Sequence, residues 1–206
     1  MKIRTSAVVR CAAGLLALCV TVGAQTTQKK TQNMPKPGAS QPSEEQMMLH
    51  SMPGAPHAAL AKLAGEYTTS TKVFMQPGAQ PQESAGDARL WMTLDGRFLA
   101  EEDSGSFFGQ QTKSFKMVGY NNASKQYEGI WTYTMSTSIM SLIGTSADGG
   151  KTITFSASFD DQSGVKQKLD INMRQSDDDH FVVELSGKTS DGKPGPRLVT
   201  TYTRKK

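Results

Sequence analysis

Apolar and polar side chains alternate along much of the second half of the chain. The segment 153–159 places Ile, Phe, Ala and Phe at every second position, with Thr or Ser between them. The same alternation runs through 181–185 and through 165–173, where Gln167 is a polar exception on the apolar face. A period of two residues is typical of a strand that buries one face, so each segment predicts an antiparallel β-strand.

Turn signals separate these segments at short intervals. They are Asp95-Gly96, Asn121-Asn122, Asp148–Gly150, Asp160–Gly164, Asp177–Asp179 and Asp191-Gly192. Asp95-Gly96 is the strongest hairpin signal, because a two-residue type I′ turn requires positive φ at both positions. We predict about ten strands, near 65–75, 85–95, 97–104, 111–120, 126–134, 137–146, 151–160, 165–175, 179–187 and 197–204.

Short strands in a meander, without helical crossovers, predict an up-and-down barrel or a sandwich. A barrel leaves no exposed strand edges, which favours it for a β-protein without disulfide bonds. A barrel of this size can enclose side chains and one small ligand. A short helix is predicted before the first strand at His57–Leu63, with Pro56 at its start and Gly65 at its end.

Residues 1–24 have the pattern of an export signal. Basic residues precede an uncharged apolar segment, Cys11–Ala24, and Val22-Gly23-Ala24 supplies the small residues that a signal peptidase recognises. The apolar segment is shorter than the about 20 residues that cross a bilayer, and no later segment is long or apolar enough. We therefore expect an exported, periplasmic or extracellular protein with no membrane span. Residues 25–56 are predicted to form a disordered linker that contains Pro, Gln and Met, and residues 57–206 the barrel domain.

Removal of the signal changes the charge and the cysteine content. The net charge falls from +4 to +1, because Lys2, Arg4 and Arg10 leave with it. So small a charge argues against a nucleic-acid partner, which requires Lys and Arg clustered on one face. Cys11 and Cys19, the two cysteines of the chain, also lie in the signal. The mature chain would then have no disulfide, no thiol nucleophile and no thiolate metal ligand.

Both ends of the predicted domain resemble a calycin. The segment Leu60–Tyr67 is similar to the calycin entrance, a short helix followed by Gly-x-Trp at the start of the first strand, although Tyr67 replaces the Trp. In lipocalin-like barrels a basic residue of the last strand often packs over that aromatic ring and closes the barrel floor. The resemblance implies that Arg204 packs on Tyr67, in a cation–π contact of about 0.5–2 kcal/mol.

A more specific resemblance is carried by three segments: LDGRFL from Leu94, VGYN from Val118 and YEGIW from Tyr127. They resemble the bacterial family of domains of unknown function numbered 1579, which has a Gly-Gly-Arg-Phe-Leu-like turn, a Gly-Tyr-Asp/Asn turn and a Tyr-x-x-x-Trp strand. The chain departs from this pattern at Asp95, which replaces the first turn glycine, and at Thr132 and Tyr133, where an acidic residue often follows the Trp. The resemblance covers roughly 57–204. It implies a calycin-like barrel and no established activity.

Large aromatic and Met side chains are the candidate ligand contacts. Trp131, Tyr133 and Met135 could line a pocket, since ligand sites are concave and mostly apolar. Aromatic residues are also routine in a barrel core, and the sequence does not separate the two. Arg97 follows the predicted turn, and could hold a carboxylate in a bidentate pair or form a structural ion pair.

Two further groups could bind metal or take part in catalysis. His180 follows Asp177–Asp179 and could act as a base or a metal ligand, although three consecutive Asp residues also suit a polar hairpin loop. A second group, of soft and borderline donors suited to Cu(I), comprises Met47, Met48, His50 and Met52. The alternative for this second group is a linker without a metal.

The sequence favours an all-β, up-and-down calycin-like barrel that binds a small apolar or amphipathic molecule in its cup without catalysis. The alternative is an interaction module with a packed barrel that contacts an envelope protein. An enzyme that uses His180, or a copper-binding protein, is a third hypothesis, for which no catalytic motif or fixed ligand spacing is present. No cofactor is predicted.

Overall fold

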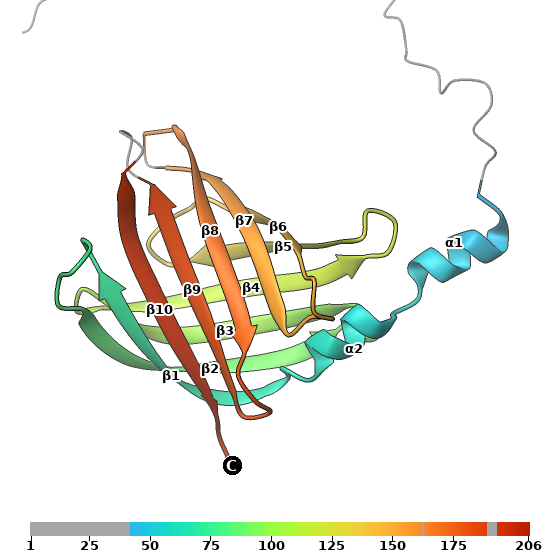
Figure 1. Ribbon diagram of the computed structural model, residues 1–206, viewed down its shortest axis with the longest axis horizontal. Helices are drawn as coiled ribbons and strands as arrows, with labels where there is room; N and C mark the ends of the chain where they lie inside the picture. Colours follow the sequence, from blue (N-terminus) through green and yellow to red (C-terminus); the bar gives the residue numbers. More distant parts are fainter. Residues whose placement is uncertain (1–41, 162, 189–192) are drawn as a thin grey trace, which may run out of the picture. The chain divides into compact units, whose positions relative to one another are not determined.

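Ten antiparallel strands form one closed barrel (Figure 1). The computed structural model describes residues 42–161, 163–188 and 193–206. The predicted export signal, the first part of the predicted linker and the Asp191-Gly192 turn lie outside these residues. Each strand is hydrogen-bonded to its neighbours in the sequence, and the last strand pairs with the first to complete the ring. The prediction of an up-and-down barrel is confirmed.

The strands are β1 (Gly65–Phe74), β2 (Gln82–Thr93), β3 (Phe98–Phe107), β4 (Gln110–Asn121), β5 (Gln126–Tyr133), β6 (Met140–Thr145), β7 (Thr152–Asp160), β8 (Lys166–Gln175), β9 (His180–Lys188) and β10 (Pro194–Arg204). All of the predicted strands are present, and most ends lie close to their expected positions. β2 and β10 begin earlier than predicted.

Alternation decides which face of each strand lies inside the barrel. In β6, Met140, Leu142 and Gly144 are buried, and the residues between them are exposed. In β7, Ile153 and Phe155 are buried in the same way. Because the ring is closed, both edges of every strand pair with a neighbour.

The hairpin between β2 and β3 is longer than predicted. Asp95 and Gly96 have the expected positive φ values, 55° and 80°, but Leu94 also lies in the left-handed region, with φ 49°. The last cross-strand pair lies outside Leu94 and Arg97. The prediction of a two-residue turn is therefore wrong. Leu94 and Arg97 belong to the turn and do not pair across the sheet.

Helix α1 (Glu44–Ser51) lies in the segment that was predicted as a linker. A capping box begins it: the Gln46 backbone N–H donates to Ser43 Oγ, and the Ser43 N–H donates to Gln46 Oε1. No residue of α1 is buried. The helix is therefore stabilised by local contacts more than by packing.

Helix α2 (Ala55–Ala61) begins two residues before the predicted start at His57. Gly54 caps it, and the Gly54 N–H donates to Nδ1 of His57 at 3.0 Å, which extends the helix towards the N-terminus. β1 starts at Gly65, where a Cβ atom would collide with the guanidinium of Arg204. Glycine is therefore needed where the chain enters the barrel.

α2 covers one end of the barrel, which we call the closed end. Leu60 and Leu63 are buried there in one core with Tyr67, Phe155 and Phe181. The loops that follow β2, β4, β6 and β8 lie at this end, and the loops that follow the odd-numbered strands lie at the opposite end, which we call the mouth (Figure 1). Within the described residues, no helix combines the length and apolar character needed to cross a bilayer.

Candidate ligand-binding cavity

The inward faces of the strands enclose a cavity of about 460 Å³. It extends from Leu60 of α2 to the mouth, where Phe107, Met135 and Phe159 contribute to its wall. Apolar side chains make up most of the lining; among them are Leu90, Leu99, Val118, Met140, Leu142, Ile171, Met173, Val183 and Leu198. A concave, mainly apolar space of this size is typical of small-molecule sites.

Charged and hydroxyl side chains of β3 and β4 meet the Tyr202 hydroxyl of β10, a strand that is a neighbour of neither. The Lys116 ammonium lies 2.6 Å from Glu101 Oε1 and 3.0 Å from Asp103 Oδ2. The Tyr202 hydroxyl donates to the same oxygen of Glu101 at 2.8 Å, and the Ser114 hydroxyl donates to Asp103. We call these five residues the charged cluster.

Strand register brings the charged cluster together. Glu101 and Asp103 are two positions apart on β3, so they face the same side as the buried Leu99. Lys116 is the cross-strand partner of Glu101, and Ser114 is the partner of Asp103. Glu101 therefore meets Lys116 directly across the sheet, and Asp103 meets Ser114.

The protonation states of the charged cluster follow from these contacts. Burial alone would lower the pKa of Lys116, but its interactions with Glu101, Tyr202 and Asp103 raise this pKa well above its ordinary value. Burial would raise the pKa of Asp103, but Lys116 and the Ser114 hydroxyl hold it below the ordinary value. Burial and the Glu101 carboxylate raise the pKa of Tyr202. At neutral pH, Lys116 is therefore an ammonium and Tyr202 a neutral phenol, and neither is an activated nucleophile.

Aromatic rings lie beside the charged cluster. The Lys116 ammonium is 5.1 Å from the ring centre of Trp131, and the Tyr133 ring is 6.1 Å from Trp131. The indole Nε1 of Trp131 is buried and has no hydrogen-bond partner among the described residues. This wall of the cavity therefore combines carboxylates with aromatic faces, and both attract cations.

Three of the four residues considered as ligand contacts line this cavity: Trp131, Tyr133 and Met135. Met135 lies near the mouth and is 40% exposed. Arg97 is elsewhere, because the β2–β3 hairpin lies at the closed end. Its Nε donates to the carbonyl oxygen of Ser51 at 3.2 Å. The structure therefore corrects the grouping of Arg97 with the other three.

The pair considered for barrel closure lies at the closed end. Arg204 Cζ is 4.9 Å from the ring centre of Tyr67. The guanidinium also donates to the carbonyl oxygens of Ala64 at 2.6 Å and Lys62 at 2.8 Å. The Tyr67 hydroxyl donates to Leu63 at 2.9 Å. These contacts connect the last strand, the first strand and the end of α2.

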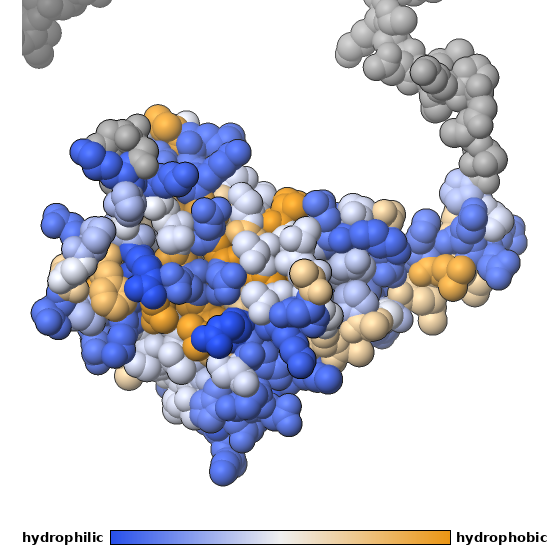
Figure 2. Space-filling view, viewed as in Figure 1, coloured by the Kyte–Doolittle hydropathy of each residue, from blue (hydrophilic) through white to orange (hydrophobic). Residues whose placement is uncertain are grey.

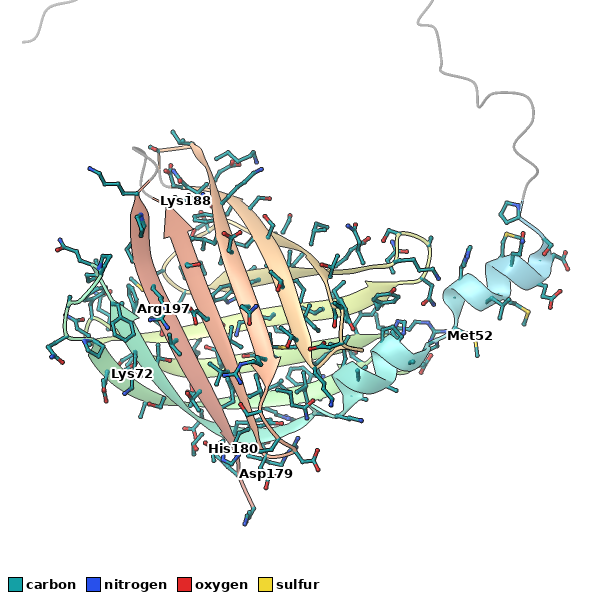
Figure 3. The ribbon with its side chains drawn as sticks, viewed as in Figure 1. Met52, Lys72, Asp179, His180, Lys188 and Arg197 are labelled. Atoms are coloured by element: carbon teal, nitrogen blue, oxygen red, sulfur yellow. The ribbon has the colours of Figure 1, made fainter. Side chains whose placement is uncertain are left out.

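His180 belongs to the surface of the β8–β9 hairpin. Its Nδ1 lies 2.8 Å from Asp177 Oδ1, which also accepts the backbone N–H of Asp179. Figure 3 shows His180 and Asp179 at the lower end of the barrel, far from Lys188. These are the contacts of a polar hairpin loop. No group of three His, Cys, Asp or Glu side chains in the described part of the chain could hold a metal ion.

The candidate copper ligands lie on α1 and just after it. They are Met47, Met48, His50 and Met52, and the three Met side chains are more than half exposed. Figure 2 shows that α1 presents hydrophobic surface beside hydrophilic surface. The copper hypothesis stays a prediction.

The charged cluster is a functional candidate that the sequence analysis missed. Glu101 and Asp103 follow Leu99 at two-residue steps within a predicted strand, so they occupy its apolar face. A carboxylate on an apolar face requires a partner, and this signal could have identified both residues. Their pairing with Lys116 depends on the register between β3 and β4.

A closed antiparallel barrel with an interior cavity and a helix over one end defines a calycin-like barrel. Within this class, the chain belongs to the family described as Protein of unknown function (DUF1579), whose model matches residues 52–204. The resemblance seen in the sequence is confirmed. The search of curated proteins finds no match.

Solved structures with similar folds include two natural proteins. Rv2717c from M. tuberculosis has a TM-score of 0.56 and 14% identity, over 74% of this chain and 99% of that one. The S-type phycobiliprotein lyase CPES from Guillardia theta has a TM-score of 0.51 and 13% identity, over 80% of this chain and 99% of that one. At these identities the likeness shows the fold alone.

Proposed function

We propose that this protein binds one small amphipathic molecule inside the barrel and does not catalyse a reaction on it. The cavity carries this proposal, because most of its wall is apolar and the charged cluster occupies one side. Transfer of apolar surface from water to such a wall contributes about 25 cal/mol per Å². The polar end of the ligand would meet the charged cluster.

The lining favours binding over catalysis. The described residues that line the cavity include no His and no Cys, which are frequent catalytic bases and nucleophiles. Lys116 keeps its proton and is held by its neighbours in the charged cluster. The alternative of an interaction module assumed a packed barrel, and the cavity supports the ligand-binding proposal instead.

The export of the protein is part of the same proposal. It is supported by the basic start, the apolar segment and the small residues that end at Ala24. A barrel that carries an amphipathic molecule between or along envelope surfaces would need such a location.

The first test introduces a larger side chain into the cavity from one strand. Val183 on β9 lines the cavity, while the adjacent Val182 is not part of its wall. We expect the uncharged fluorophore N-phenyl-1-naphthylamine to bind the wild type with one molecule per chain. Val183→Trp should weaken binding at least about tenfold, a loss of about 1.4 kcal/mol, because the indole occupies the ligand's space. Fluorescence titration measures the number of fluorophore molecules bound per chain and the affinity of each variant.

Val182→Trp is the matched control, because it adds the same side chain to the outer face of the same strand. It should bind the fluorophore as the wild type does. Circular dichroism verifies that both variants fold. Absence of binding to the folded wild type, or unchanged binding by Val183→Trp, would contradict the proposal.

A further inference from the structure

The charged cluster carries an excess of negative charge. Glu101 and Asp103 are two carboxylates, and one ammonium, that of Lys116, is paired with both. A second lysine at the cavity, Lys113, is exposed and lies on the outward-facing register of β4, opposite Ser104. The formal charge of the inward-facing cluster is therefore −1.

The hydrogen bonds of the cluster occupy its lysine fully. The Lys116 ammonium donates to Glu101, Asp103 and Tyr202, and these three bonds use all three of its N–H groups. The hydroxyls of Tyr202 and Ser114 donate to Glu101 Oε1 and to Asp103 Oδ2. A carboxylate withdrawn from water is stable when it is paired with a cation or takes up a proton. With two carboxylates and one ammonium, the cluster has the charge to receive a further positively charged group.

The surrounding rings favour the same kind of group. Trp131 and Tyr202 have their ring centres 5.1 and 6.0 Å from the Lys116 ammonium, and Tyr133 lies next to Trp131. Aromatic faces attract cations more strongly where water is excluded. An incoming ammonium would meet carboxylates and aromatic faces together, whereas a carboxylate would meet like charge.

We infer that the cavity takes cationic amphiphiles, molecules with an apolar chain or ring system and one protonated amine or similar group, and that it discriminates against fatty-acid-like anions. The inference rests on the proposed function, because it assigns the ligand class of the same cavity. The cationic end would lie against Glu101 and Asp103, and the apolar part would extend along the wall towards Val183 and the mouth.

The test uses three ligands that share one chain and differ in head-group charge: decylamine, 1-decanol and decanoate. Each displaces N-phenyl-1-naphthylamine from the full mature chain at neutral pH and low salt. We expect decylamine to displace it at an at least about tenfold lower concentration than decanoate, with 1-decanol between them. Complementary charge in a largely buried site supplies the difference.

Two variants and a matched control test whether the carboxylates of the cavity cause the preference for a cationic head group. Glu101→Gln and Asp103→Asn each remove the excess charge, so each should reduce the preference for decylamine over decanoate at least about fivefold. The affinity for 1-decanol should stay near that of the wild type. Glu102→Gln makes the same change on the exposed face of β3 and should keep the preference. If one cavity variant fails to fold, the other still tests the inference.

The outcomes separate this inference from the proposed function. If 1-decanol and the fluorophore bind but decylamine and decanoate bind equally, or decanoate binds more tightly, the ligand class is wrong and the proposed function stands. If Glu102→Gln changes the preference as much as Glu101→Gln does, surface charge is responsible and the inference fails. If neither the fluorophore nor 1-decanol binds, the proposed function fails and the ligand class fails with it.

Discussion

Glu101, Asp103 and Lys116 contribute less to stability than their short distances suggest. Withdrawing ions from water costs several kcal/mol for each ion, and replacing a buried ion pair by apolar side chains is often neutral or stabilising by about 1–4 kcal/mol. On other strands, inward positions such as Leu142 and Ile171 are filled by apolar residues. Packing of the barrel does not explain why β3 and β4 carry charged residues on their inner faces. Binding of a charged ligand would explain them.

Asp161, in the β7–β8 loop at the mouth, should make stability depend on pH. Its carboxylate accepts hydrogen bonds from Ser163, Gln167 and Val165. These bonds lower the pKa of Asp161 from 3.8 to about 2. Because the folded-state pKa is the lower one, the stabilisation is present above about pH 4 and is lost as the pH falls through about 2.

Asp161→Asn should therefore lower the free energy of unfolding near neutral pH, and the difference from wild type should disappear by about pH 2. Urea unfolding at a series of pH values measures the difference. Asp160→Asn is a control, because Asp160 pairs with Lys166 and accepts none of these loop hydrogen bonds. A difference for Asp161→Asn that is constant from neutral pH to about pH 2 would contradict the assigned role.

At the scale of the elements, α1 and α2 are helices of similar length with different burial. Leu60 of α2 is 2% exposed and Leu49 of α1 is 65% exposed. We expect Leu60→Ala to lower the free energy of unfolding by about 2–5 kcal/mol, because it leaves a cavity in the core. Leu49→Ala should change it by no more than about 0.5 kcal/mol. Denaturant unfolding distinguishes the two, and equal effects would show that α2 is not part of the folded core.

Aromatic packing at the closed end determines where the cavity lies in the whole molecule. The Tyr67 ring is 5.2 Å from Phe181 at a steep angle, and Phe181 stacks on Tyr202 at 4.1 Å. These rings and the Leu residues of α2 fill that half of the interior. The space that remains lies between this layer and the mouth, so a ligand would enter from the side opposite α2.

The proposed export concerns the whole chain and can be tested directly. Expressed in a bacterium with an intact secretion pathway, the full chain should yield a protein whose intact mass begins at Gln25, in the fraction outside the cytoplasm. Ala24→Leu should block this cleavage, because the peptidase requires a small residue there. A chain that starts at Gln25 after an initiator Met should stay in the cytoplasm. Recovery of the full mass from the cytoplasm would contradict the proposal.

The two site residues Trp131 and Glu101 show how far the site could be predicted. Trp131 could be chosen from its size and its place in a strand, but its role as cavity wall or core was open. Glu101 carried a local signal, since it shares the face of Leu99. Its partner could not be predicted, because Lys116 becomes its neighbour through strand register. Arg97 was wrongly grouped with the cavity residues for a related reason. The sequence does not show at which end of the barrel a turn lies relative to the cavity.

The sequence by itself determined the ten strands, the helix before them and the family, because alternation, turn residues and short motifs are local properties that neighbouring residues encode. Only the tertiary structure decided that the barrel encloses a cavity, that the charged cluster faces into it and that Arg97 lies at the other end. An empty volume is what remains after side chains from all ten strands have packed, and a charge cluster depends on register between strands. Neither quantity is a property of any one segment.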